Sequence, residues 1–344
     1  MKLAAARLLL SLTPAALGAQ TGGIVGYLVA RGTGDALAHG IVGVETANRS
    51  AFTSDSGWFS FRELTPGQHL LRVRRLGFSP REVSFVVRDG ITDTLRVELS
   101  RVAVQLGTVD VKAYPPCVTP GAPSSEADST MAAVVEQIRL NAEQYTFLAE
   151  QYPYWYLTVI SRSSKRRRDG EIGREPSFVE RYQSSSKSTY KPGAVIQRRG
   201  RDYIFQVPTL VEVADKSFVD AHCWHYGGTE VVEDEPLIRV DAVAFDSLRG
   251  PDVNGTFFVS SRTFQIRRSV VHLSRRPTQI PELVDMEVTS EFFEVLPSIP
   301  IIEKVHSVQT IDPKRKSLIS EAYEDHTTTR FTWVKRAPGD DKKP

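Results

Sequence analysis

The stretch SDSGWFSFRELTPG, Ser54 to Gly67, decides the fold of the first part of the chain. It places a short aromatic strand between two turn signals, Asp-Ser-Gly before it and Pro-Gly after it. Glycine adopts the positive φ angles that tight turns require, and proline favours the first corner of a turn. Because side chains alternate across a strand, Phe59 and Phe61 share one face and Trp58 lies on the other. The stretch therefore predicts a short β-strand with one buried face.

Similar short runs lie on both sides of this strand, between residues 23 and 111. They stop at Gly, Pro, Asn or Asp, with a spacing of about ten residues that is typical of β-sandwiches. The runs are GIVGYLVA, GIVGVETA, WFSFREL, QHLLRVRRLG, REVSFVV and DTLRVEL. We therefore predict a β-sandwich over residues 21–112.

This order of strands and turns resembles the carboxypeptidase regulatory-like domain, a seven-stranded β-sandwich of the transthyretin (prealbumin) type. The residues that carry the resemblance are Gly26, Gly40 to Val44, Thr53 to Phe61, Leu64 to Gly67 and Leu76-Gly77-Phe78. In that family the module lies beside a peptidase domain or ahead of an outer-membrane receptor plug. Leu106 to Tyr114 resembles the strand that leads into such a receptor, and the alternative is a last sandwich strand.

The first nineteen residues predict a secretory signal peptide. Lys2 and Arg7 give a positive start, LLLSLTPAAL is the apolar centre, and small residues near Ala19 form a cleavage site. The apolar run is much shorter than the roughly 20 residues that span a bilayer. We expect an exported protein of the periplasm or cell surface that is not integral to the membrane; peripheral association stays open.

Length and charge narrow the possible partners. The 344 residues suggest two domains, at the usual size of roughly 100 to 200 residues each. The formal net charge is +2, and removal of Lys2 and Arg7 with the signal takes two positive charges away, which leaves a balance of zero. A neutral chain gives no electrostatic case for binding nucleic acid.

The second half begins with a linker and a long helix. Residues 113–127 are rich in Pro, Ser and Gly, which is typical of a linker. Apolar residues then recur at three- and four-residue steps, which predicts a helix from Asp128 to Tyr152, and Pro153 ends it. The apolar stripe consists of Met131, Val134, Val135, Ile138, Ala142, Tyr145 and Leu148.

Beyond the helix the pattern is that of β-strands again, including KSFVDAHCW, KSLISEAYED and TTRFTWV as separate strands. The last six predicted strands, between residues 255 and 334, follow one another through short loops, as in an antiparallel meander. A long meander buries a helix by curling over it. We therefore predict a mainly β protein with an α+β second domain over residues 128–336, in which a curved half-barrel sheet holds the helix on its concave face. A disordered tail is expected at residues 337–344.

Cys117 and Cys223 are the only cysteines. In an exported protein a single disulfide is the simplest interpretation, and two buried free thiols are the alternative.

Residues 117 to about 300 also resemble an uncharacterised C-terminal region of secreted bacterial proteins, found behind regulatory-like sandwiches. In that region a Cys before the helix recurs with one in a His-Cys-aromatic strand, which implies the same pairing here. The predicted half-barrel is also similar in shape to lipoprotein-carrier folds.

Catalytic and metal-binding motifs are missing from the sequence. No histidine has Glu three residues later, as a metallocarboxypeptidase zinc site needs, and HExxH, GxSxG, Walker and CxxC motifs are absent. His222 and His225 of HCWH fall on opposite faces of a strand, so both cannot reach one metal ion without a bulge. We assign no catalytic, cofactor or metal-binding residue, and we name Trp58, His222 and His225 as candidate ligand contacts.

The basic run SSKRRRDGEIG, Ser163 to Gly173, allows two interpretations. It docks on phosphates or anionic lipid head groups, or it is a solvated hairpin tip, which we favour because it contains no aromatic residue. Trp58 likewise either stacks on a sugar or has a structural role in the sandwich.

These observations favour a non-enzymatic envelope protein. The sandwich serves binding or assembly, and the second domain recognises an envelope protein partner or holds a lipid-like ligand. One alternative is glycan binding through the sandwich. The other is a hydrolase with a site near His222, Cys223 and His225, beside Asp220.

Overall fold

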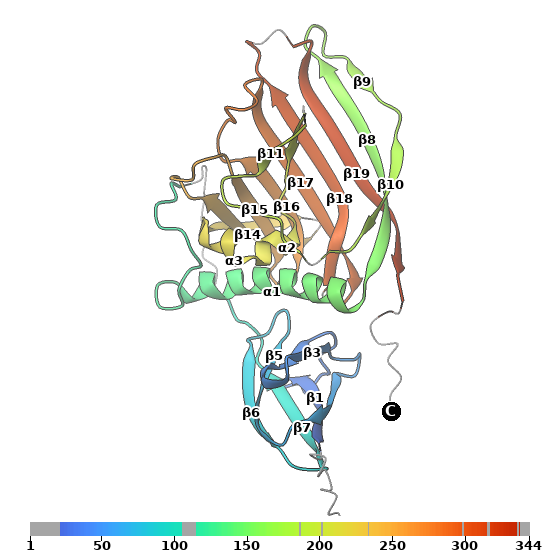
Figure 1. Cartoon of the computed structure of the whole chain (residues 1–344). Helices are drawn as coiled ribbons and strands as arrows, with labels where there is room; N and C mark the ends of the chain where they lie inside the picture. The colour runs from blue at the N-terminus through green and yellow to red at the C-terminus, as the bar shows by residue number, and fades with distance from the viewer. Residues whose placement is uncertain are drawn as a thin grey trace, which may run out of the picture.

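The computed structural model describes residues 21–104, 115–335 and 337, apart from residues 186, 201, 233, 298, 315 and 316. The predicted signal peptide, the segment Leu106 to Tyr114 and all of the predicted tail except residue 337 lie outside the described residues. A β-sandwich, a long helix and a large curved sheet follow one another in space (Figure 1).

The N-terminal part is a sandwich of seven strands, as the sequence predicts. One sheet has the order β4-β1-β7 and the other β3-β2-β5-β6. β1 pairs with β4 in antiparallel and with β7 in parallel orientation. The strands are β1 (Gly22–Ala30), β2 (Ile41–Val44), β3 (Arg49–Phe52), β4 (Trp58–Leu64), β5 (Gly67–Arg74), β6 (Arg81–Val87) and β7 (Thr92–Leu99), with a short 3₁₀ helix at Glu45–Ala47.

The quoted stretch forms β4 and the turn before it. Phe59 and Phe61 are 1% and 2% exposed in the core of the sandwich, whereas Trp58 on the opposite face is partly exposed. Gly57 has a φ of +73°, and a Cβ atom there would lie 2.3 Å from the carbonyl oxygen of Leu28. A side chain is therefore excluded at this turn, which explains why the sequence has glycine.

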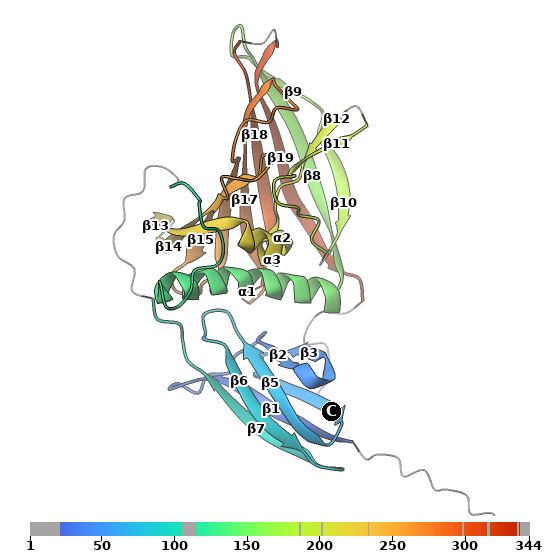
Figure 2. The same ribbon diagram turned by 60° about the vertical axis from the view of Figure 1, so that its left-hand side comes forward.

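The second part contains one large antiparallel sheet with the order β10-β8-β19-β18-β17-β16-β15-β14-β13, and β9 pairs with β8. The sheet is strongly curved (Figures 1 and 2). Its strands are β8 (Tyr154–Arg166), β9 (Ile172–Arg174), β10 (Phe178–Gln183), β13 (His222–Val232), β14 (Glu235–Ala244), β15 (Val253–Ser260), β16 (Ile266–Leu273), β17 (Leu283–Leu296), β18 (Ile299–Ile311) and β19 (Ile319–Trp333). A separate hairpin joins β11 (Ile196–Arg199) to β12 (Asp202–Phe205). The mainly β architecture with a helix and a large antiparallel sheet is confirmed.

Two strand predictions were wrong in detail. The run KSFVDAHCW is not one strand, because its first part is the short helix α3 (Lys216–Asp220). The Asp215 side chain caps that helix by accepting a hydrogen bond from the Ser217 N–H at 2.8 Å, so local capping prevails over the strand pattern. The last two predicted strands are the single strand β19, in which an irregularity near Thr328 replaces the expected turn.

Helix α1 (Ser129–Gln151) begins at Asp128, whose carboxylate accepts a hydrogen bond from the Met131 N–H. Its predicted apolar stripe packs into the main core of the sheet together with α2 (Leu210–Ala214) and α3, except for Leu148, which lies in a separate cluster with Ile41 and Phe52 of the sandwich. The opposite side of α1 faces the sandwich (Figures 1 and 2). The helix is therefore covered on two sides, although the sequence predicted only one buried stripe.

Polar side chains of α1 bind the backbone of the sandwich. Gln137 is 1% exposed; its Oε1 accepts a hydrogen bond from the Gly77 N–H at 2.7 Å, and its amide donates to the Phe78 carbonyl at 3.4 Å. Glu143 forms an ion pair with Arg74 at 2.5 Å. Leu76 lies in the same buried cluster as the α1 stripe, so the sandwich contributes a side chain to the core of the second part.

The segment after residue 115 lies along the outer edge of β13. Cys117 forms a disulfide with Cys223, and the Gly121 N–H donates to the His222 carbonyl at 2.9 Å. This short stretch occupies one free edge of the large sheet. Within the described residues, no helix combines the length and apolar character needed to cross a lipid bilayer.

Candidate functional site

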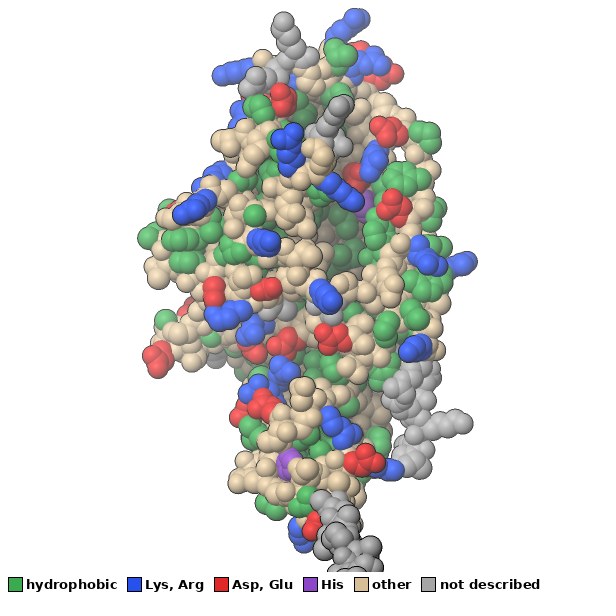
Figure 3. Space-filling view, viewed as in Figure 1, with side chains coloured by type: hydrophobic (Ala, Val, Ile, Leu, Met, Phe, Trp, Pro, Cys, Tyr) green, Lys and Arg blue, Asp and Glu red, His purple; other side chains and the backbone are tan. Residues whose placement is uncertain are grey.

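An apolar cavity of about 240 Å³ lies between α2 and the concave face of the large sheet. Hydrophobic side chains dominate its wall, and Ser269, Ser290 and His326 add polar groups. Figure 3 shows that the molecule is hollowed on this face. The cavity is lined by Val207, Pro208, Thr209, Leu210, Val213, Phe257, Ser269, Ser290, Phe292, Ile302, Val305 and His326.

The strand register explains how five strands supply these side chains. Phe257 pairs with Ser269, Ser269 with Ser290, Ser290 with Val305, and Val305 with His326. Directly paired residues of neighbouring strands point to the same face of a sheet. These five side chains thus form one row across the concave face, with Phe257 at one end and His326 at the other.

The segment between β12 and α2 closes the cavity on the side away from the sheet. Thr209 caps α2, and the Glu212 carboxylate accepts a hydrogen bond in return from the Thr209 N–H at 2.9 Å. The chain leading into β11 is anchored at buried Asp252, which accepts hydrogen bonds from the Tyr190 hydroxyl and the Gly193 N–H, both at 2.7 Å. These bonds hold the segment before α2 and the chain leading into β11 in place over the sheet.

Charged side chains lie next to His326, at one end of the row. The Nε2 of His326 lies 2.7 Å from a carboxylate oxygen of Glu324, and the Arg162 Nε donates to the other oxygen at 2.5 Å. Burial opposes ionisation of Glu324, but its two partners outweigh burial and hold the pKa of its carboxyl below the ordinary value. An ionised Glu324 therefore fixes the orientation of His326 at the edge of the cavity.

We expect replacement of Glu324 by Gln to lower the free energy of unfolding at pH 7 and to lower it by less in acid. A carboxyl with a lowered folded pKa stabilises the fold above its unfolded pKa of 4.5, and the contribution disappears as the pH falls through the folded value. The loss at neutral pH should be about 1 kcal/mol or less, as for partly exposed ion pairs. Urea unfolding between pH 3 and pH 7 measures it. Glu126→Gln, at an exposed site, is the control, and an equal loss at both pH values would contradict the assignment.

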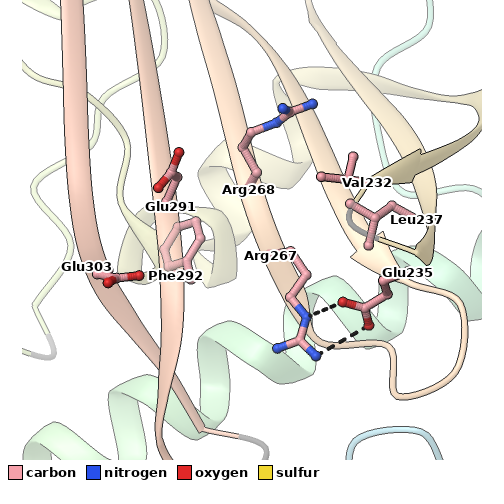
Figure 4. A pocket seen from close by; sticks show the side chains of 8 residues that line it. All are labelled: Val232, Glu235, Leu237, Arg267, Arg268, Glu291, Phe292 and Glu303. Atoms are coloured by element: carbon pink, nitrogen blue, oxygen red, sulfur yellow. Dashed lines mark hydrogen bonds and ion pairs between the residues drawn. The ribbon is translucent and has the colours of Figure 1, made fainter.

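A second, charged cavity of about 290 Å³ lies beside the first, and Phe292 lines both. Figure 4 shows Arg267 held by two hydrogen bonds to Glu235, whereas Arg268 points away from that pair. Arg268 is paired with Glu230 at 2.9 Å and lies over the ring of Phe258. Because both cations already have partners from the protein, this cavity is the weaker candidate for a ligand site.

The predicted HCWH residues do not converge on either cavity. His222 is fully buried, with its Nδ1 2.7 Å from the Phe218 carbonyl oxygen and its Nε2 3.0 Å from that of Val253. Burial lowers its pKa. His225 is half-buried on the opposite face of β13, and its Nε2 has no hydrogen-bond partner within the described residues. The exposed Asp220 pairs with Lys216.

The other predicted positions lie apart from the cavity. The disulfide between Cys117 and Cys223 packs with Val243 on the outer side of the sheet. Trp58 pairs directly with Tyr27 on the outer face of the sandwich, where Tyr27 is 45% exposed. Within the described parts of the chain, no cluster of three or more His, Cys, Asp or Glu side chains is arranged to bind a metal ion.

The cavity residues were missed by sequence reasoning. Ser269, Ser290 and His326 lie on three strands and carry no motif, and they come together only through the register of the sheet. The available signal in the sequence was a polar residue in strands whose residues otherwise alternate between apolar and polar. That signal is weak, because most such residues are simply exposed.

Several solved structures are similar to parts of this chain. A DUF1329 family protein from Desulfovibrio piger is 10% identical with a TM-score of 0.32; the match covers 59% of this chain and 95% of that one. A LolA superfamily protein from Nitrosomonas europaea is 14% identical with a TM-score of 0.30, covering 60% and 96%. A minor pilin from Streptococcus agalactiae is 17% identical with a TM-score of 0.23, covering 26% of this chain and 48%, or about half, of the pilin.

The search of curated proteins found no match to the sequence. The family model described as the carboxypeptidase regulatory-like domain matches residues 23–100. These residues span the seven strands of the sandwich almost completely. The N-terminal sandwich of this protein is therefore a carboxypeptidase regulatory-like domain, a module that is not itself catalytic.

Proposed function

We propose that this protein is a non-enzymatic exported protein whose second domain binds an apolar ligand in the cavity on the concave face of its sheet. The observation that carries the proposal is the cavity of about 240 Å³ with mainly hydrophobic walls. Binding sites for drug-sized molecules usually have roughly 300–1,000 Å³, so this cavity suits a short apolar group or one end of a longer chain. The hydroxyls of Ser269 and Ser290 and the imidazole of His326 would bind a polar group on the ligand.

Export is supported by the disulfide, because structural disulfides persist in oxidising compartments such as the periplasm and cell surface. The regulatory-like sandwich then serves as the support of the binding domain. Its Leu76-Gly77-Phe78 segment contacts α1, which in turn packs under the sheet that forms the cavity. In this proposal the sandwich contributes to binding by holding the curved sheet in shape.

The geometry gives less support to a hydrolase. The imidazole of His326 is bonded to Glu324 and to no hydroxyl of the described residues. Nucleophilic catalysis by serine needs a hydroxyl within hydrogen-bond reach of the base. Each ring nitrogen of His222 lies against a backbone carbonyl oxygen and the side chain is fully buried, so a substrate cannot reach this imidazole as a base.

We expect Val305→Trp to weaken binding of a fluorescent apolar probe, N-phenyl-1-naphthylamine, by at least about ten-fold. The larger ring would fill the cavity, and pockets of this kind discriminate about 10- to 200-fold per added or missing methylene group. Titration of the probe, together with mass spectrometry of lipid that co-purifies with the chain, measures the effect. The matched control is Val231→Trp, at a valine that is 68% exposed. Equal probe affinity in the two variants would contradict the proposal.

A further inference from the structure

The end of the large sheet farthest from α1 is formed by two neighbouring turns (Figures 1 and 2). One joins β8 to β9 across residues 167–171, and the other lies between β18 and β19, where the structure describes residues 312–314 and 317–318. The basic run noted in the sequence covers the end of β8, the first turn and the start of β9. We call the described residues of these turns, together with the adjoining ends of β8, β9 and β19, the sheet tip (residues 166–174, 312–314 and 317–319).

Large apolar side chains are exposed at the sheet tip. Leu318 is 82% exposed, Ile172 is 44% exposed and Ile319 is 36% exposed. Leu318 has the largest exposed fraction among the exposed large hydrophobic residues that the structure describes. An aliphatic side chain that protrudes at the end of a protein is costly to hydrate unless another surface covers it.

Basic residues lie near these apolar side chains along the chain. Arg168, Arg174 and Lys314 are exposed, and none of them forms an ion pair with another described residue. Arg166 is the exception, because Asp169 and Glu171 neutralise it at 3.1 and 2.9 Å. In Figure 3, Lys and Arg side chains gather at the upper end of the molecule, where the two turns lie.

Arg167 has a structural role and joins the two turns. Its guanidinium donates hydrogen bonds to the carbonyl oxygens of Ser317 at 3.2 Å, Asp312 at 3.2 Å and Ile319 at 3.0 Å. Bonds to a charged donor are stronger than neutral ones. The sheet tip is therefore a built surface, in which one arginine fixes the positions of the exposed apolar and basic side chains.

We propose that the sheet tip docks on the surface of an anionic lipid membrane. The free cations would bind lipid phosphates, while Leu318 and Ile172 would enter the boundary between head groups and acyl chains. Charge complementarity favours an anionic bilayer over a neutral one. A bilayer also accepts the small, protruding shape of the tip, whereas a stable protein partner needs roughly 800 Å² of surface on each side.

The test is co-sedimentation of the full chain with vesicles. Vesicles of pure phosphatidylcholine are compared with vesicles that contain phosphatidylglycerol as about one third of the lipid. Each basic residue near an anionic leaflet strengthens binding about five-fold. The triple variant Arg168→Glu, Arg174→Glu, Lys314→Glu should therefore lose at least about 100-fold in affinity. Leu318→Asn should weaken binding while leaving the net charge of the tip, and so the attraction of its cations to anionic lipid, unchanged.

Matched controls lie on the sandwich, at the opposite end of the molecule. Arg31→Glu, Arg62→Glu, Arg81→Glu reverses three exposed charges there, and Val86→Asn changes an exposed valine without adding charge. Arg167 is left unchanged in every variant, so that the sheet tip keeps its structure. Thermal unfolding of each variant confirms that the fold is intact.

Stronger binding to anionic than to neutral vesicles, lost in the triple tip variant and kept in the triple sandwich variant, supports the proposal. Equal binding to both vesicle types, no binding at all, or equal loss in both triple variants would overturn it. Competition by inorganic phosphate beyond that of chloride at matched ionic strength would also overturn it, because the site would then be one for free phosphate. The result is independent of the cavity, which the naphthylamine titration tests without membranes.

Discussion

Replacement of Cys117 and Cys223 by Ser is expected to lower the free energy of unfolding by about 4–5 kcal/mol, because the disulfide closes a loop with a sequence separation of 106. The chain-entropy model gives such a value for loops of this length, since the cross-link removes many conformations of the unfolded chain. The bond also fixes the stretch that covers the outer edge of β13. Urea unfolding of the double variant against the oxidised chain measures the difference.

Reductant provides the control for this experiment. The chain unfolded in the presence of dithiothreitol should match the double Ser variant, and dithiothreitol should leave that variant unchanged. An unfolding midpoint that is the same with and without reductant would contradict the predicted contribution. A free edge at β13 predicts a second effect, because unpaired strand edges favour aggregation. The double variant should therefore aggregate at lower concentration.

Local sequence signals predicted the parts of the fold that local physics determines. The strand around Phe59 lies between turns that only certain residues can form, and the structure places it as expected. The long helix was predicted within one residue at each end, because Asp128 caps it and Pro153 follows it. Local signals failed where a cap competed with a strand pattern, at Asp215, and where a turn was inferred from the polar residues of β19.

The second buried face of α1 could not be predicted from its sequence. Gln137, Asn141 and Gln144 are polar and would normally indicate a solvated face. Each is buried, because each hydrogen-bonds to a backbone group from a distant part of the chain. The sequence shows that these side chains can form such bonds but not with which partners.

The cavity was beyond sequence reasoning for the same reason. His326 comes close to Val305 and to the two serines only because β17, β18 and β19 pair in one particular register. A shift of one residue in any of these strands would turn the row to the opposite face. Predicting the site therefore needs the whole sheet, whereas the HCWH motif attracted attention because its residues are adjacent in sequence.

Leu76→Ala should destabilise the second domain, although residue 76 belongs to the sandwich. Leu76 is 2% exposed and lies in one buried cluster with Val134, Ile138 and Phe264. Truncation of a buried leucine leaves a cavity and usually costs about 2–5 kcal/mol. Urea unfolding measures this loss in a Trp58→Phe background, where all remaining tryptophans belong to the second domain. The expected result is a lower midpoint of the tryptophan fluorescence transition with an unchanged slope.

The control for this prediction is Val86→Ala, because Val86 is 61% exposed on the sandwich and exposed substitutions usually change stability by less than about 0.5 kcal/mol. A tryptophan transition in Leu76→Ala that coincides with that of the parent would mean that the sandwich and the sheet are stabilised separately. A lower midpoint means that the sandwich supplies part of the core under the curved sheet. In that case, loss of the sandwich contact should also weaken binding in the cavity, since α1 supports the strands that line it.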